Sequence, residues 1–171
     1  GKKYMDSETI PFMVLPSIDK KLRCEFKKHN VVIGDVVAVY SEKYNKLVFA
    51  IYADNGPADK LGEGSLSLGW ELRGTPDNEK TDASSAVVTG DVRYLLFPAS
   101  AAGAPYSFES IQNSGKEHLE EWADWTLFWS CKTELWEACC RDPFAGVLLL
   151  AEFQPTLNIG NNFTSGTFPP C

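Results

Sequence analysis

Two runs of β-branched and aromatic residues with a short polar segment between them constrain the fold more than any other feature of the sequence. The first run is Val31–Tyr40 (VVIGDVVAVY) and the second is Lys46–Ala53 (KLVFAIYA), with Ser41–Asn45 between them. This pattern is typical of two strands joined by a turn. The sequence therefore predicts a β-hairpin, and Val87–Pro98 and Ala145–Phe153 are predicted to add further strands.

Helices are predicted at two places outside these strands. Ser65–Leu72 has leucines one turn apart and is followed by Gly74, a residue that commonly ends a helix. Ser114–Glu117 (SGKE) matches a capping box, and apolar residues follow it at helical spacing, so the segment 114–141 is predicted to be helical. The expected fold class is mainly β with added helices (α+β).

The chain length fits one folded unit. With 171 residues it is predicted to form a single domain over 1–171 that buries an ordinary core without a metal or a disulfide. The segment 75–86 is polar and lacks apolar periodicity, so we expect an exposed loop there. The Gly-, Asn- and Pro-containing segment 154–171 is expected to be an irregular C-terminal tail, and the small residues Ala99–Pro105 are candidates to line a cleft.

The charge excludes some partners and favours others. A formal net charge of −7 and a pI near 4.8 argue against nucleic acid, which requires a basic surface. No apolar run approaches the roughly 18 residues of a membrane-spanning helix, so no membrane partner is expected. An acidic surface attracts cations, including a polycationic polymer. The chain is expected to be a monomer.

Cysteine spacing does not predict a metal site, and no cofactor is expected. Paired C-x-x-C ligands are absent from the sequence. Two disulfides with one free thiol, or unpaired cysteines throughout, both fit the pattern. A thiol peptidase would need a reactive cysteine beside His118, and nothing in the sequence indicates one. The five cysteines are Cys24, Cys131, Cys139, Cys140 and Cys171.

The stretch that follows the second strand carries two carboxylates at the two ends of one Gly- and Pro-rich turn. Asp54 ends the strand, and Glu63 lies between Gly62 and Gly64. Hydrolysis of a glycosidic bond needs one carboxyl group as proton donor and one carboxylate to activate water or attack the sugar. Asp54 and Glu63 meet this requirement, although a tight turn with two solvated acids explains the same residues.

Aromatic residues near these acids are candidates to bind a sugar ring. Strict alternation along the second strand places Tyr52 on the same face as Asp54. Trp70 follows closely in sequence. Tyr52 and Trp70 are therefore predicted to bind substrate, whereas the tryptophans of the segment 114–141 have helical spacing and are better explained by core packing.

The residues around the two acids resemble a known enzyme family. AIYADNGPADKLGEGSLSLGWEL is similar to the signature of glycoside hydrolase family 75, the fungal-type chitosanases. GDVVAVY (34–40) and VRYLLFPAS (92–100) resemble flanking strands of that family, so the resemblance covers roughly residues 31–100. It implies a glycoside hydrolase that cleaves β-1,4 bonds of chitosan within the chain and inverts the anomeric configuration.

The resemblance also implies roles for particular residues. Asp54 and Glu63 match the two essential acids of the family, with Glu63 expected as general acid and Asp54 as general base. Chitosan carries an ammonium group on each free glucosamine, and Asp35, Asp59 and Glu71 are candidates to bind these amines. The expected partner is thus a cationic amino-sugar polysaccharide, and the expected location is secreted or in the cell envelope, with no signal segment in this sequence.

A second, shorter resemblance keeps an alternative open. The strand-Asp-Gly-Pro order is similar to the double-psi β-barrel of lytic transglycosylases and expansins. It implies a barrel-like core with a helical insertion, and a peptidoglycan-active enzyme as the alternative function. A non-catalytic carbohydrate-binding protein is a further alternative, although it would not need to keep both acids.

Overall fold

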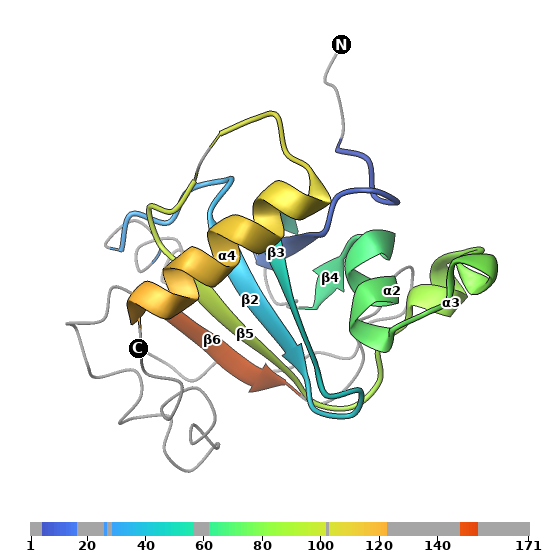
Figure 1. The fold of residues 1–171 in the computed structure, drawn as a ribbon. Helices are drawn as coiled ribbons and strands as arrows, with labels where there is room; N and C mark the ends of the chain where they lie inside the picture. The colour runs from blue at the N-terminus through green and yellow to red at the C-terminus, as the bar shows by residue number, and fades with distance from the viewer. Residues whose placement is uncertain are drawn as a thin grey trace.

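The computed structural model describes residues 5–16, 26, 29–56, 62–101, 103–122 and 148–153. Within these residues the strands form one mixed sheet of six strands, ordered β4-β1-β3-β2-β5-β6 from edge to edge (Figure 1). β1 runs parallel to β3, and every other neighbouring pair is antiparallel. The strands are β1 (Phe12–Pro16), β2 (Val36–Ser41), β3 (Lys46–Gly56), β4 (Glu63–Gly64), β5 (Val92–Phe97) and β6 (Leu148–Phe153).

The predicted hairpin is confirmed. β2 and β3 pair from Val36 with Ile51 to Ser41 with Lys46. Asn45, with φ of 48°, takes the left-handed conformation that the turn requires and that asparagine tolerates better than most residues. The predicted strands at Val87–Pro98 and Ala145–Phe153 are also present, in the shorter form of β5 and β6.

The sheet separates two apolar clusters because consecutive residues of each strand project to opposite faces. In β2, Val37 and Val39 lie in one cluster and Val36 and Ala38 in the other. The first cluster contains residues of α2 (Leu66–Arg73), and the second contains residues of α4 (Phe108–Trp122). Figure 1 shows α4 lying across β2, β3 and β5. We call these faces the α2 face and the α4 face.

Helix α2 (Leu66–Arg73) lies within one residue of the predicted Ser65–Leu72 at each end. The Ser65 side chain accepts a hydrogen bond from the backbone N–H of Leu68 and caps the first turn. Gly74 ends the helix in the left-handed conformation, with φ of 66°. Leu68 and Leu72 are fully buried against the sheet, and each such side chain contributes about 2 kcal/mol of burial free energy.

Helix α4 differs from its prediction at its start. It begins at Phe108, more than a turn before Ser114, so the capping-box interpretation of Ser114–Glu117 is wrong. Gly115 lies in the helix interior because a Cβ there would overlap the Phe49 ring. The Gln112 side-chain amide binds both backbone groups of Phe49. Its Nε2 donates to the Phe49 carbonyl at 2.7 Å, and its Oε1 accepts from the Phe49 N–H at 3.0 Å.

The predicted loop 75–86 is more ordered than expected. It contains the 3-10 turn η1 (Asp77–Glu79) and the short helix α3 (Ala83–Ala86). Asp82 and Ser85 form a capping box at the start of α3. Most of the segment is nevertheless exposed, which agrees with its polar composition.

The α+β class is confirmed, whereas a double-psi barrel is not what the described residues form. The sheet is open, with β4 at one edge and β6 at the other and no pairing between them. A barrel requires that pairing. The short sequence resemblance that suggested the barrel reflects a strand followed by a turn, which an open sheet also provides. In the part of the chain that the structure describes, no helix has the length and apolarity needed to cross a membrane.

Candidate active site

Asp54 and Glu63 lie on different strands but at the same level of the sheet. Asp54 is in β3 and Glu63 opens β4, with β1 between these two strands. Val14 of β1 is the partner of Asp54 on one side and of Glu63 on the other. Paired residues of neighbouring strands project to the same face. The two carboxylates therefore share one face, with Val14 between them.

A β-bulge decides which face Asp54 takes. Met13 pairs with Tyr52, but the next residue of β1, Val14, pairs with Asp54, so Ala53 is an extra residue in β3. Met13 and Tyr52 belong to the α2-face cluster, which places Val14 and Asp54 on the α4 face. The expectation that Tyr52 and Asp54 share a face is wrong because the bulge interrupts the alternation.

Gly56 provides the space into which the Glu63 side chain extends. A Cβ on Gly56 would lie 2.8 Å from Val14 Cγ1 and 3.4 Å from Glu63 Oε2. Gly56 comes two residues after Asp54 in the same strand, a distance of about 6.6 Å along β3. The Glu63 carboxylate thus reaches across β1 toward the strand that carries Asp54.

Hydrogen bonds to β1 hold the segment that carries Glu63. The Ser65 backbone N–H donates to the Phe12 carbonyl at 2.9 Å, and the Phe12 N–H donates to Ser65 Oγ at 3.0 Å. Gly62 takes φ of 104°, a conformation that favours glycine. The Gly-Glu-x-Ser order therefore has a local cause: the glycine turns the chain, and the serine joins α2 to β1.

Tyr52 does not offer its ring to a ligand. The side chain is buried in the α2-face cluster, and its hydroxyl donates to Asn55 Oδ1 at 2.6 Å. Burial raises the pKa of the Tyr52 phenol, and the carboxylates of Asp54 and Asp35 raise it further. The phenol therefore keeps its proton and acts as a hydrogen-bond donor.

Asp35 is a buried residue whose carboxylate is bound by backbone amides. Its side chain is fully buried, with Oδ2 accepting from the Val32 N–H at 2.8 Å and Oδ1 accepting from the Ala101 N–H at 3.2 Å. Burial raises the pKa of the Asp35 carboxyl, and backbone amides partly oppose this effect. The carboxylate joins the segment before β2 to the segment after β5, and it is not displayed to a polymer at the surface.

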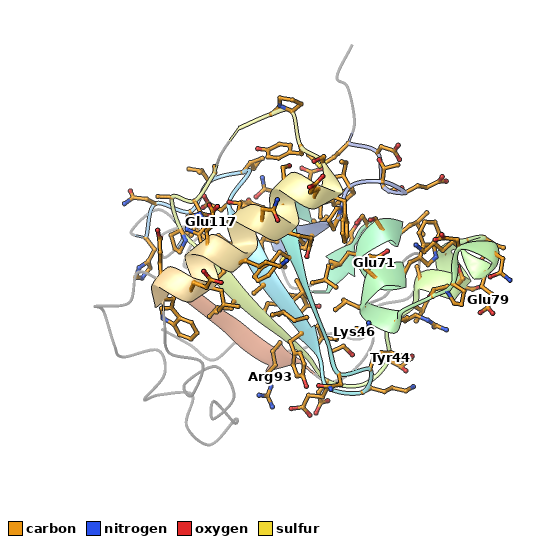
Figure 2. All side chains as sticks on the ribbon, in the orientation of Figure 1. Tyr44, Lys46, Glu71, Glu79, Arg93 and Glu117 are labelled. Atoms are coloured by element: carbon orange, nitrogen blue, oxygen red, sulfur yellow. The ribbon has the colours of Figure 1, made fainter. Side chains whose placement is uncertain are left out.

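Trp70 and Glu71 lie on α2, which packs on the face of the sheet opposite the two acids. Trp70 is buried in α2, and its Nε1–H donates to Ser85 Oγ at 2.7 Å. Glu71, also on α2 (Figure 2), forms an ion pair with Lys80 at 3.1 Å. Asp59 lies outside the described residues.

A pocket on the α4 face includes residues that the sequence did not single out. It has a volume of about 110 Å³, with Val36, Ile51 and Ile111 as apolar lining. Ile51 of β3 belongs to the α4-face cluster, and the bulge after Tyr52 brings Asp54 to this face as well. The pocket and the two acids therefore share one face of the sheet. Gly103 and Pro105 line it, in agreement with the cleft expected at Ala99–Pro105. Further lining residues are Gly34, Tyr106, Ser110 and Ser114.

Outside Ala99–Pro105, the sequence contains no pattern that would have predicted the residues that line this pocket. Ser110 and Ser114 are one turn apart on α4, but serines at that spacing are common on exposed helix faces. Tyr106 contacts Gly34 so closely that a Cβ on Gly34 would lie 2.6 Å from the Tyr106 hydroxyl oxygen. Only the fold brings these segments together.

A family model described as fungal chitosanase of glycosyl hydrolase group 75 matches residues 1–123 of the chain. The chain belongs to this family. The resemblance expected over residues 31–100 is thereby confirmed, and the match also includes β1, the strand between the two acids. No curated protein sequence matches the chain. The protein is a glycoside hydrolase of the chitosanase type, a class whose substrate is a polysaccharide.

Where the structure describes this chitosanase-type hydrolase, it shows no candidate metal centre. Over the described ranges, no group of three or more His, Cys, Asp or Glu side chains is arranged to hold a metal ion. All five cysteines and the segment 123–141 of the predicted second helical region lie outside the described residues, as does the predicted tail 154–171.

Proposed function

We propose that this protein is an endo-acting hydrolase that cleaves β-1,4 bonds between glucosamine units of chitosan and inverts the anomeric configuration. Glu63 is the general acid that protonates the leaving oxygen. Asp54 is the general base that activates a water molecule. No metal or other cofactor takes part in this mechanism, in which the two carboxyl groups carry both proton transfers.

The shared partner of the two acids is the observation that carries this proposal. Neighbouring strands lie about 4.8 Å apart, so two strands that both pair with β1 are separated by roughly 10 Å at the level of Val14. The carboxyl groups of inverting glycosidases lie about 6.5–9.5 Å apart, which leaves room for water. Glu63 extends toward Gly56, two residues after Asp54 in β3, so its carboxyl group lies nearer to β3 than its own strand does. This approach supports the proposed inverting separation.

The exposure of the two side chains supports the division of roles. Asp54 is exposed, and Glu63 is half-buried. A base that acts on water must be open to solvent. The longer Glu63 side chain spans β1, which suits a group that reaches the glycosidic oxygen.

The family and the charge support chitosan as the substrate. The family description names a chitosanase. The net charge of −7 favours a polymer that carries one ammonium group on each free glucosamine. A polysaccharide such as chitosan does not cross a membrane, so we propose that the enzyme is secreted. We also propose that it acts as a monomer.

Release of reducing ends from fully deacetylated chitosan tests the proposal. Asp54→Asn and Glu63→Gln are expected to lower kcat at least about 100-fold, because each removes one proton-transfer group. Glu117→Gln, on the exposed side of α4 (Figure 2), is the control and is expected to keep the wild-type rate. A wild-type rate in either active-site variant would contradict the assigned pair.

Two product analyses separate this proposal from its alternatives. Proton NMR of the first product is expected to show the α-anomer, and a β-anomer would contradict inversion. Peptidoglycan is assayed in parallel. Anhydro-sugar ends released from peptidoglycan, with no release from chitosan, would favour a lytic transglycosylase instead.

A further inference from the structure

The bulge in β3 is closed by a hydrogen bond between two side chains. Tyr52 donates its hydroxyl proton to Asn55 Oδ1 at 2.6 Å. In a regular strand, residues three positions apart project to opposite faces and do not meet in this way. With Ala53 as an extra residue, Tyr52 pairs with Met13 and Asn55 pairs with Leu15. Tyr52 and Asn55 therefore lie on one face, and their hydrogen bond exists only in the bulged register.

The same register determines how the Asp54 carboxylate is held. The Asn55 backbone N–H donates to Asp54 Oδ1 at 2.8 Å. Among the described residues, no donor reaches Oδ2. One oxygen of the carboxylate is thus held by the backbone of the next residue.

The surroundings of Tyr52 make it a rigid anchor for this arrangement. Its ring packs in the α2-face cluster beside Met13 and Leu15, which are both fully buried. Asn55, in contrast, is exposed. The hydrogen bond therefore connects the exposed end of β3 to the packed core, and the end of the strand acquires a fixed conformation.

We propose that Tyr52 and Asn55 are positioning residues for Asp54, because their hydrogen bond keeps the bulge at Ala53 and with it the orientation of the Asp54 carboxylate toward the face of Glu63. This inference rests on the proposed role of Asp54 as the general base. Tyr52 and Asn55 project to the α2 face, opposite the two acids, so the inference assigns them no contact with the sugar.

Tyr52→Phe and Asn55→Ala test the inference in the full chain. Both variants are expected to lower kcat on deacetylated chitosan about 10-fold, because small displacements of a catalytic group are costly. KM is expected to stay within about twofold, since the residues do not bind substrate. The double variant is expected to lose no more than the worse single variant, because both changes remove one hydrogen bond.

Tyr94→Phe is the matched control. Tyr94 is a buried tyrosine of β5 in the same cluster, and it lies away from the bulge. Loss of its hydroxyl is expected to leave kcat unchanged. An equal loss of kcat in Tyr94→Phe, or an unchanged kcat in Tyr52→Phe, would overturn the inference.

Hydrogen exchange of the Asn55 amide, resolved by NMR, gives a readout that does not require turnover. Exchange is expected to be faster in Tyr52→Phe than in the wild type and unchanged in Tyr94→Phe, and equal exchange in all three proteins would overturn the inference. Asp54→Asn separates the two proposals. If this variant keeps activity, the role of Asp54 fails; if it is inactive while Tyr52→Phe is fully active, only the positioning role fails.

Discussion

Gly56 is the residue whose small size matters most near the two acids. It lies on β3 where Val14 of the neighbouring strand β1 and the side chain of Glu63, which reaches across β1 from β4, both approach it. A methyl group at this position would press on Val14 and contact the Glu63 carboxylate. Because Val14 lies between the two acids, any shift of its side chain changes their separation.

Gly56→Ala is therefore expected to reduce kcat about 10-fold or more and to lower the free energy of unfolding by about 1–3 kcal/mol, the usual cost of overpacking. Steady-state kinetics and urea unfolding measure the two effects. The double variant Gly56→Ala/Val14→Ala removes the closest contact, which is 2.8 Å, and is expected to recover part of the lost activity. No change in kcat for Gly56→Ala would contradict a role for this space.

At the level of elements, Gln112 of α4 takes the place of a neighbouring strand. β1 pairs with β3 only from Ile51 onward, so the Phe49 backbone has no strand partner on that side. The Gln112 amide provides both the donor and the acceptor that a strand would provide. The helix is thereby attached to the sheet edge by polar contacts as well as by the packing of Gly115 on Phe49.

Gln112→Ala is expected to lower the free energy of unfolding by about 2–3 kcal/mol, because it leaves the N–H and C=O of a buried residue without partners. Asn113→Ala changes the next residue of the same helix, which is exposed, and is expected to cost about 0.5 kcal/mol or less. Urea unfolding monitored by circular dichroism provides both values. Equal losses in the two variants would contradict a contribution of the Gln112–Phe49 hydrogen bonds to the free energy of unfolding.

For the whole molecule, buried tyrosines set the response to alkaline pH. Burial raises the pKa of the Tyr94 phenol and of the Tyr52 phenol. In the unfolded chain these groups lose their protons near pH 10. The unfolded state therefore releases protons first, and its relative free energy falls as the pH increases.

Below about pH 10 these two tyrosines are not expected to change the free energy of unfolding. Above about pH 10 the free energy of unfolding is expected to decrease by up to about 1.4 kcal/mol per pH unit for each tyrosine. Urea unfolding between about pH 8 and pH 11 measures this slope. Tyr94→Phe removes one of the two groups and is expected to reduce the slope. An identical slope in the variant would contradict the assignment.

The sequence predicted those parts of the fold that depend on nearby residues. The alternation in Lys46–Ala53, the leucine spacing in Ser65–Leu72 and the Gly74 that ends this segment are local signals, and the structure contains the corresponding hairpin and helix. SGKE at residues 114–117 is also a local signal, but it failed. Residues 108–113 extend the helix toward its N-terminus, so Ser114 lines the pocket instead of capping a turn.

For the candidate site, the sequence offered residue types but not their geometry. Asp54 and Glu63 were identified from their chemistry and from the family resemblance, and the structure places them on one face. The extra residue Ala53 has no sequence signature, so alternation alone put Asp54 on the wrong face. Asp35 was predicted to bind the amines of the substrate, but it is buried and accepts hydrogen bonds from backbone amides of segments far apart in the chain.

The placement of β1 has a stereochemical consequence. For residues at the same level of different strands, the distance between side chains increases by about 4.8 Å for each step from one strand to the next. If β4 paired directly with β3, the carboxyl groups would be one step apart, near the roughly 5–5.5 Å of glycosidases that retain configuration through a covalent intermediate. Under the proposed mechanism, the insertion of β1 between the strands of the two acids is what selects inversion, and the configuration of the product would depend on where residues 12–16 insert.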